Sequence, residues 1–153
     1  LSGAVGFAVS ARMKGDTESR VFALVSDGEM EEGQLWEAAM FASHHGLDNL
    51  IVLLDANDSQ VDGPVTSVTT IEPIAAKWES FGWAAYEVDG HDPDAISEAL
   101  ERAMEADRPA VVIGRTSTRR GLDCLPQDAD GHFIKLPPEL AERARRELEG
   151  RLA

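Results

Sequence analysis

Four short runs of apolar residues limit how this chain can fold. Each has the length of a β-strand, and the runs at 21–25, 50–54 and 109–114 have no charged residue, a pattern typical of buried strands covered on both faces of a sheet. The runs cover residues 21–25, 50–54, 83–88 and 109–114. Segments with helical spacing of apolar residues precede and separate them, at 2–14, 34–45, 73–81 and 92–106. This alternation predicts a three-layer α/β domain with a mostly parallel sheet.

Composition excludes several classes of function. The 153 residues are enough for one domain with a core, and the net charge of −14 argues against nucleic acid as a partner. No apolar run is long enough to span a membrane. The single cysteine, Cys124, excludes an intrachain disulfide and favours a reducing, cytoplasmic location. Nothing beside Cys124 would activate it as a nucleophile.

The regular pattern ends after Gly114. We expect an α/β domain over residues 1–114, an irregular loop on the active-site side over 115–136, and a terminal helix over 137–153. The chain opens within an apolar helix, so we also expect the domain to be incomplete at its N-terminus.

Polar residues follow the first two apolar runs directly. Asp27 and Gly28 end the first run, and Asn57 lies just beyond the second. The carboxyl ends of neighbouring parallel strands are where open α/β sheets bind ligands. A carboxylate and a carboxamide, without histidine or thiolate, suit a hard cation such as Mg2+. Asp-Gly and Asn-Asp are also common in ordinary turns, and this alternative stays open at this point.

Residues 26–63 resemble the thiamine diphosphate signature of transketolases, in which a Gly-Asp-Gly ends one strand and an Asn follows the next. The intervening residues are similar too, including Glu32-Gly33-Gln34, Trp36-Glu37-Ala38-Ala39, Asp48-Asn49-Leu50 and Gln60-Val61-Asp62-Gly63. The similarity extends over about residues 1–114. It implies the thiamine-diphosphate-binding fold, with thiamine diphosphate and Mg2+ as cofactors.

The resemblance also implies ligands for these cofactors. Asp27 would give Mg2+ a carboxylate oxygen, Asn57 its side-chain oxygen and Ser59 its backbone carbonyl. Gly28 and Glu29 would lie at the diphosphate, where glycine lets backbone N–H groups approach an anion.

Three further positions carry roles by the same resemblance. Val61 would pack near the thiazolium ring, and Glu32 would be the carboxylate that links the two cofactor sites of a dimer. A solvated glutamate at the start of a helix is the alternative for Glu32. His132 would correspond to a histidine near the diphosphate and the reacting centre, whereas His91 is expected to be a turn residue that supports the fold.

Two residues depart from the family pattern. Ser26 replaces the first glycine of Gly-Asp-Gly, which questions any backbone conformation that needs glycine there. Ser59 replaces an apolar residue, a change that a carbonyl ligand tolerates.

The resemblance implies a transketolase-like transferase that moves a two-carbon ketol unit from a ketose phosphate to an aldose or other acceptor. The pyrimidine-binding domain or subunit would come from a partner, giving a homo- or hetero-oligomer such as a heterotetramer, and the chain alone would be inactive. The alternatives are a pyruvate-using thiamine diphosphate enzyme and a non-catalytic scaffold or binding subunit.

Overall fold

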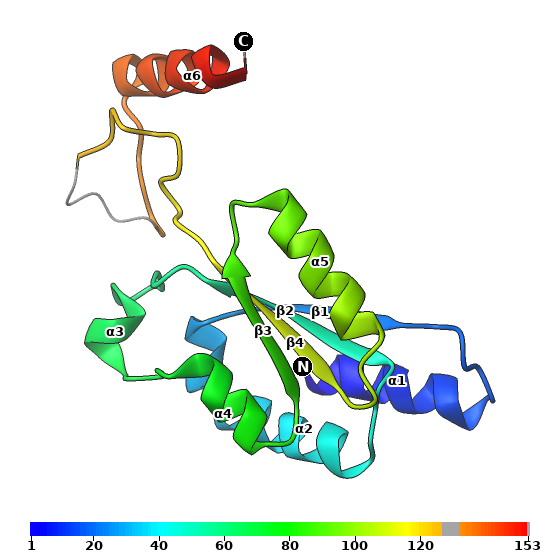
Figure 1. The fold of residues 1–153 in the computed structure, drawn as a ribbon. Coiled ribbons are helices and arrows are strands. Elements are labelled where there is room, and N and C mark those ends of the chain that lie inside the picture. The colour runs from blue at the N-terminus through cyan, green and yellow to red at the C-terminus, as the bar shows by residue number, and fades with distance from the viewer. Residues whose placement is uncertain (127–131, 153) are drawn as a thin grey trace.

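The computed structural model describes residues 1–126 and 132–152. Its helices and strands alternate along the chain as the sequence predicts, and most bounds differ from the expected ones by one or two residues (Figure 1). The elements are α1 (Ser2–Met13), β1 (Val21–Ser26), the 3-10 helix η1 (Gly28–Glu31), α2 (Gly33–His44), β2 (Leu50–Ala56), α3 (Val65–Val68), α4 (Ile74–Ser80), β3 (Ala84–Asp89), α5 (Pro93–Met104), β4 (Ala110–Arg115) and α6 (Pro138–Leu152).

The strands form a parallel sheet of four in the order β1-β2-β4-β3. The pairs run in register, with Ser26 opposite Asp55 and Asp55 opposite Gly114. The carboxyl ends of β1, β2 and β4 therefore lie side by side. This arrangement confirms the predicted α/β fold with a parallel sheet.

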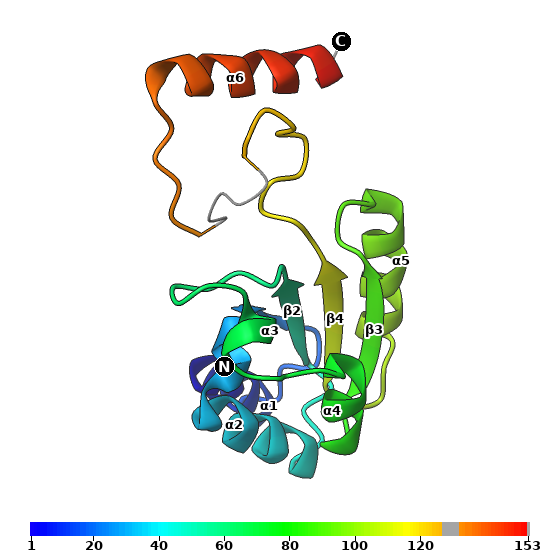
Figure 2. The ribbon, with the colours of Figure 1, turned by 90° about the vertical axis from the view of Figure 1, so that its left-hand side faces the viewer.

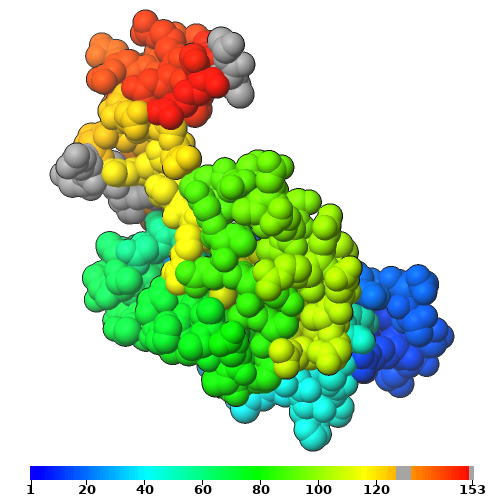
Figure 3. Space-filling model, viewed as in Figure 1, coloured from blue at the N-terminus to red at the C-terminus, as the bar shows by residue number. Residues whose placement is uncertain are grey.

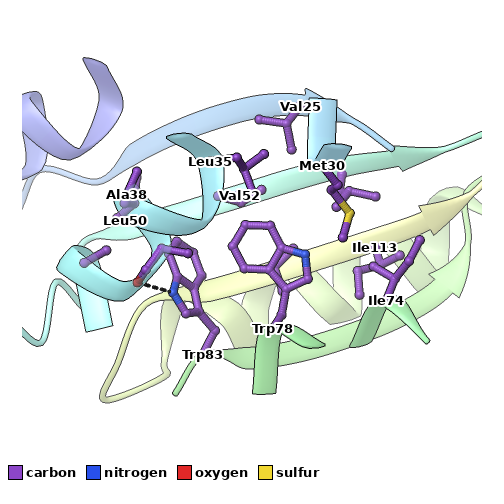
Figure 4. Close-up of a cluster of buried hydrophobic side chains, with 14 of the residues drawn as sticks. Val25, Met30, Leu35, Ala38, Leu50, Val52, Ile74, Trp78, Trp83 and Ile113 are labelled. Carbon is purple, nitrogen blue, oxygen red and sulfur yellow. Dashed lines mark hydrogen bonds between the residues drawn. The ribbon is translucent and has the colours of Figure 1, made fainter. Parts of the chain in front are cut away.

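Helices cover the two faces of the sheet unequally. Figure 2 shows α1, α2 and α4 on one side of the sheet and α5 on the other. The larger core lies on the first side, where Trp78 and Trp83 are fully buried and pack edge to face with ring centroids 4.8 Å apart (Figure 4). The Trp83 indole donates a hydrogen bond to the Ala39 carbonyl in α2, 2.9 Å away. The helix layer and the sheet are thereby joined at the centre of the core.

The prediction that the strand at residues 21–25 is covered on both faces is wrong. Phe22 is 49% exposed and Leu24 is 75% exposed, because α5 packs over β3 and β4 and does not reach β1. Leu24 instead borders a hollow of about 410 Å³ that Leu53 and Leu100 also line. A continuous apolar run does not distinguish a central strand from an edge strand with one open face.

The structure contains two short helices that the sequence pattern does not predict, η1 and α3. Residues 116–126 are irregular and α6 follows, in the predicted order; residues 127–131 lie outside the described part of the chain. Figure 3 shows α6 and the preceding segment projecting from the body of the domain. Arg151 ties α6 back to this segment through an ion pair with Asp123. Among the described residues, no helix is long and apolar enough to cross a membrane.

Candidate cofactor site

The two predicted ligand residues lie at the ends of adjacent strands. Asp27 follows the last residue of β1, and its N–H donates to the Asp55 carbonyl of β2 at 3.1 Å. Asn57 follows the last residue of β2. Because β1 and β2 are parallel neighbours in register, residues thirty positions apart in sequence meet at one edge of the sheet.

The Asp27 carboxylate is buried, with only 3% of the residue exposed. Its Oδ1 accepts a hydrogen bond from Gly28 N at 2.9 Å, and its Oδ2 accepts one from Asp58 N at 2.6 Å. Burial raises the pKa of Asp27 above its ordinary value, opposed by these two hydrogen bonds and reinforced by the nearby charges of Asp55 and Asp58. In the described part of the chain, no Lys, Arg or His side chain forms an ion pair with it.

The Asn57 carboxamide is held at both ends. Its Nδ2 donates to Asp55 Oδ2 at 2.8 Å, and its Oδ1 accepts from Ser59 N at 2.8 Å. A carbonyl oxygen has two lone pairs, so Oδ1 keeps the capacity to bind a cation.

The carboxylate of Asp27 and the carboxamide oxygen of Asn57 fit Mg2+ as two of its several ligands. A buried carboxylate with no cationic partner among the described residues and a half-buried carboxamide oxygen are hard ligands, as Mg2+ requires. The described residues contain no group of three or more His, Cys, Asp or Glu side chains that could hold a metal by themselves. An ion here would need further oxygens from the backbone, water or a bound diphosphate.

Ser26 is compatible with its place at the end of β1. It lies in the strand and does not have the positive φ that favours glycine. Its hydroxyl accepts from Glu29 N at 3.3 Å, while Glu29 Oε2 accepts from Ser26 N at 2.7 Å. This reciprocal pair has the form of a capping box, so serine supports the start of η1. The Glu29 carboxylate is engaged in this local pair.

Gly28 lies against the loop that follows β2. A Cβ atom on Gly28 would come within 3.2 Å of Gln60 Cβ, so a larger residue would push the loop away. Gln60 also donates to Glu31 Oε1 at 2.9 Å and pairs with Gly63 across the turn. Val61, at the tip of this turn, is 63% exposed. Contact of Gly28 with a diphosphate and of Val61 with a thiazolium ring both stay predictions.

Glu32 and His132 are the remaining predicted site residues. Glu32 occupies the position before the first residue of α2, where its side chain makes no capping hydrogen bond, and it borders a small hollow with Leu1 and Ser2. His132 is exposed, and its ring packs on Phe133 with centroids 4.5 Å apart. Their proposed roles, like those of the other site residues, stay predictions.

Two further residues belong to the site although no sequence motif marks them. Asp55 binds Asn57 on one side and the Thr116 hydroxyl on the other. The sequence could have indicated Asp55, which lies two residues before Asn57. It could not have indicated Thr116, which follows the last residue of β4 and is 61 positions from Asp55. His91 is a turn residue, as expected, and its Nε2 accepts from Ser117 N at 2.8 Å.

Comparison with known proteins identifies the family of this domain. The family model described as "Transketolase, thiamine diphosphate binding domain" matches residues 4–148. A solved transketolase from Campylobacter jejuni superposes with a TM-score of 0.87 at 28% identity, covering 97% of this chain and 24% of that one.

Two curated relatives are named as subunits of transketolases. The chain is 37% identical to the 6-deoxy-6-sulfo-D-fructose transketolase subunit SqwG of Clostridium sp. (strain MSTE9), covering 97% of this chain and 54% of that protein. It is 33% identical to an apulose-4-phosphate transketolase subunit from Actinobacillus succinogenes, covering 95% of this chain and 52% of that protein. The chain thus spans about half the length of these relatives. Because the family model extends over nearly all of its residues, the chain belongs to the transketolase family and corresponds to its thiamine diphosphate binding domain.

Proposed function

We propose that this chain forms the diphosphate- and Mg2+-binding part of a transketolase-like enzyme. The enzyme transfers a two-carbon ketol unit from a ketose phosphate to an aldose or other acceptor. The observation that carries this proposal is the buried Asp27 carboxylate, which lies beside the Asn57 carboxamide at the ends of neighbouring strands without a cationic partner in the described part of the chain.

The residues of this chain bind and orient the cofactor. Asp27, Asn57 Oδ1 and the Ser59 carbonyl would hold Mg2+, which would neutralise the diphosphate. Gly28 would lie against the diphosphate, where the absence of a side chain leaves room for it, and Val61 would pack near the thiazolium ring. Bound thiamine diphosphate supplies the electron sink for cleaving and forming the carbon–carbon bond.

Glu32 and His132 take the roles nearest the reacting end of the cofactor. We assign Glu32 to the contact between the two cofactor sites of an oligomer and His132 to the diphosphate and substrate side. Glu32 lies just before the first residue of α2, and His132 lies in an exposed loop. A partner or substrate can therefore reach both side chains.

A partner supplies the pyrimidine site. Both relatives named above are transketolase subunits, which supports a two-component assembly with a separate pyrimidine-binding subunit. Their names give two different sugar substrates, so we leave the donor and acceptor of this chain open. We also propose a reducing, cytoplasmic location, since Cys124 is the only cysteine.

The structure gives no support to a non-catalytic scaffold or to a cysteine nucleophile. A serine in place of the family glycine would favour a scaffold without cofactor if it distorted the end of β1, yet Ser26 forms the capping pair with Glu29 and adopts ordinary strand geometry. Burial raises the pKa of the Cys124 thiol, and Glu147 raises it further, so a cysteine nucleophile is disfavoured.

Calorimetry on the full-length chain tests this proposal. Thiamine diphosphate is titrated with and without Mg2+, in the presence and absence of a pyrimidine-binding subunit. We expect binding that depends on Mg2+ and strengthens with the partner, followed by ketol transfer from ketose phosphates and no turnover of pyruvate. Absence of cofactor binding in every pairing would rule out the enzyme. Turnover of pyruvate alone would favour the pyruvate-using relative.

A further inference from the structure

A series of hydrogen bonds joins Thr116, which directly follows β4, to Asn57 through Asp55. The Thr116 hydroxyl donates to Asp55 Oδ1, and Asp55 Oδ2 accepts from Asn57 Nδ2 at 2.8 Å. Backbone pairing fixes the position of Thr116. Its N–H donates to the Ala56 carbonyl at 3.2 Å and so extends the β2–β4 ladder by one step. The series therefore joins the ends of two strands through three side chains.

Gly90 leaves room for Thr116 in this position. A Cβ atom on Gly90 would collide with Thr116 Cγ2 and would lie 3.1 Å from the Arg115 carbonyl. The end of β3 thus packs closely against the end of β4, and the Thr116 side chain is pressed toward β2. The hydroxyl reaches Asp55 as a consequence of packing among three neighbouring strands.

These hydrogen bonds determine which way the Asn57 amide faces. A carboxylate is only an acceptor, so it selects the NH2 group of the amide. A flipped amide would place Oδ1 against Asp55 and Nδ2 against Ser59 N, which exchanges two hydrogen bonds for two repulsive contacts. The amide oxygen is thereby held on the side of the loop backbone.

That side is also where the Asp27 carboxylate lies. Asp27 Oδ2 accepts from Asp58 N at 2.6 Å, and Asn57 Oδ1 accepts from Ser59 N at 2.8 Å. These donors are consecutive in the chain, and Asp58 has a φ of 54°, so both oxygens converge on the same short turn. A cation bound between them would meet one carboxylate oxygen and one amide oxygen.

We propose that Asp55 and Thr116 are positioning residues that hold the Asn57 amide oxygen toward this turn and thereby determine the affinity of the site for Mg2+. The inference rests on the proposed function. Asp55 acts through Asn57, because one of its carboxylate oxygens accepts from the Asn57 amide and the other from the Thr116 hydroxyl, which ties the carboxylate to the orientation of that amide. Residues that orient a metal ligand in this way typically change metal affinity 10- to 100-fold when they are removed.

Two substitutions at Thr116 separate the hydroxyl from the shape of the side chain. Thr116→Val keeps the branched shape and removes the donor, whereas Thr116→Ser keeps the donor. Asp55→Ala removes the acceptor for both neighbours. Asp89→Ala is the matched control, because Asp89 ends β3 and its carboxylate accepts from His91 N at 2.9 Å, outside this series of hydrogen bonds.

Mg2+ affinity is measured by calorimetry on the full-length chain with thiamine diphosphate and the pyrimidine-binding subunit. We expect affinity to fall about 10- to 100-fold in Asp55→Ala and about 10-fold in Thr116→Val. Thr116→Ser and Asp89→Ala are expected within about twofold of wild type, since both keep the series of hydrogen bonds intact. In the metal-free protein, NMR should show the Asn57 side-chain amide shifted and exchanging faster in Asp55→Ala and Thr116→Val only.

The outcomes distinguish the inference from the proposed function. Wild-type protein that binds no Mg2+ with the cofactor would refute the function, and the positioning role with it. Wild-type binding with unchanged affinity in Thr116→Val and Asp55→Ala would overturn the positioning role alone. If Asp55→Ala does not fold, the two Thr116 variants decide, because equal loss in Thr116→Val and Thr116→Ser would show that the hydroxyl has no part.

Discussion

Replacing Asp27 with alanine removes the one buried carboxylate of the described residues, and two effects of different size should follow. The first is on cofactor binding. Loss of residues that merely orient a ligand already weakens metal binding 10- to 100-fold, so loss of the ligand itself should cost at least about 100-fold. We expect Asp27→Ala to show no Mg2+-dependent binding of thiamine diphosphate by calorimetry.

The second effect is on stability, and it should be small. The N–H groups of Gly28 and Asp58 lose their acceptors, which costs about 1–3 kcal/mol each. Removal of a buried charge offsets part of this loss, because the raised pKa of Asp27 shows that its ionised form is disfavoured by burial. We expect a net loss of about 1–3 kcal/mol in metal-free protein by denaturant unfolding, less than the total of about 5–15 kcal/mol for a folded domain.

Asp58→Asn is the control for the loss of one negative charge at the site. The Asp58 carboxylate accepts from Thr66 and not from the end of β1, and asparagine tolerates its positive φ. Cofactor binding should therefore survive in Asp58→Asn. Mg2+-dependent binding by Asp27→Ala at the wild-type level would refute the assignment of Asp27 as a ligand.

Three further changes test the framework around the site. Trp83→Phe removes the indole hydrogen bond to the Ala39 carbonyl and part of a fully buried ring, and should lower the free energy of unfolding by about 1–3 kcal/mol in urea; an unchanged midpoint would contradict this. Gly82→Ala places a side chain at a φ of 87° against α2 and should cost at least about 1 kcal/mol, with thermal unfolding as the measurement. A hydrogen bond from Arg115 lowers the pKa of Glu72 in the folded protein. The ion pair therefore stabilises the fold at pH values above the ordinary pKa of the carboxyl. This stabilisation is lost as the pH falls through the lowered pKa of Glu72. Glu72→Gln should thus lower the free energy of unfolding by about 0.5–1 kcal/mol at pH 7, a small amount because the pair is partly exposed. The difference in this free energy between variant and wild type should shrink below pH ~4.5. A difference that persists at pH 2 would exclude the ion pair as its cause.

Local sequence patterns were sufficient for the order and type of the main elements. Apolar runs and helical spacing report on neighbouring residues, and the strands at 21–25 and 50–54 each match a strand of the structure within one or two residues. The sequence was also sufficient to predict that Asp27 and Asn57 lie at neighbouring strand ends, because in a parallel sheet consecutive strand ends meet at the same edge. The residues between this pair carried the family resemblance.

Tertiary packing determined which strand lies at the edge and which distant residues come into contact. No local sequence pattern relates residues so far apart in the chain. The β1-β2-β4-β3 order leaves Leu24 exposed on the open face of an edge strand, although its run resembles a central one. The same order brings Thr116, which directly follows β4, to Asp55 of β2. Short-range periodicity determines which segments become strands, but only the pairing of those strands determines which side chains meet where they end.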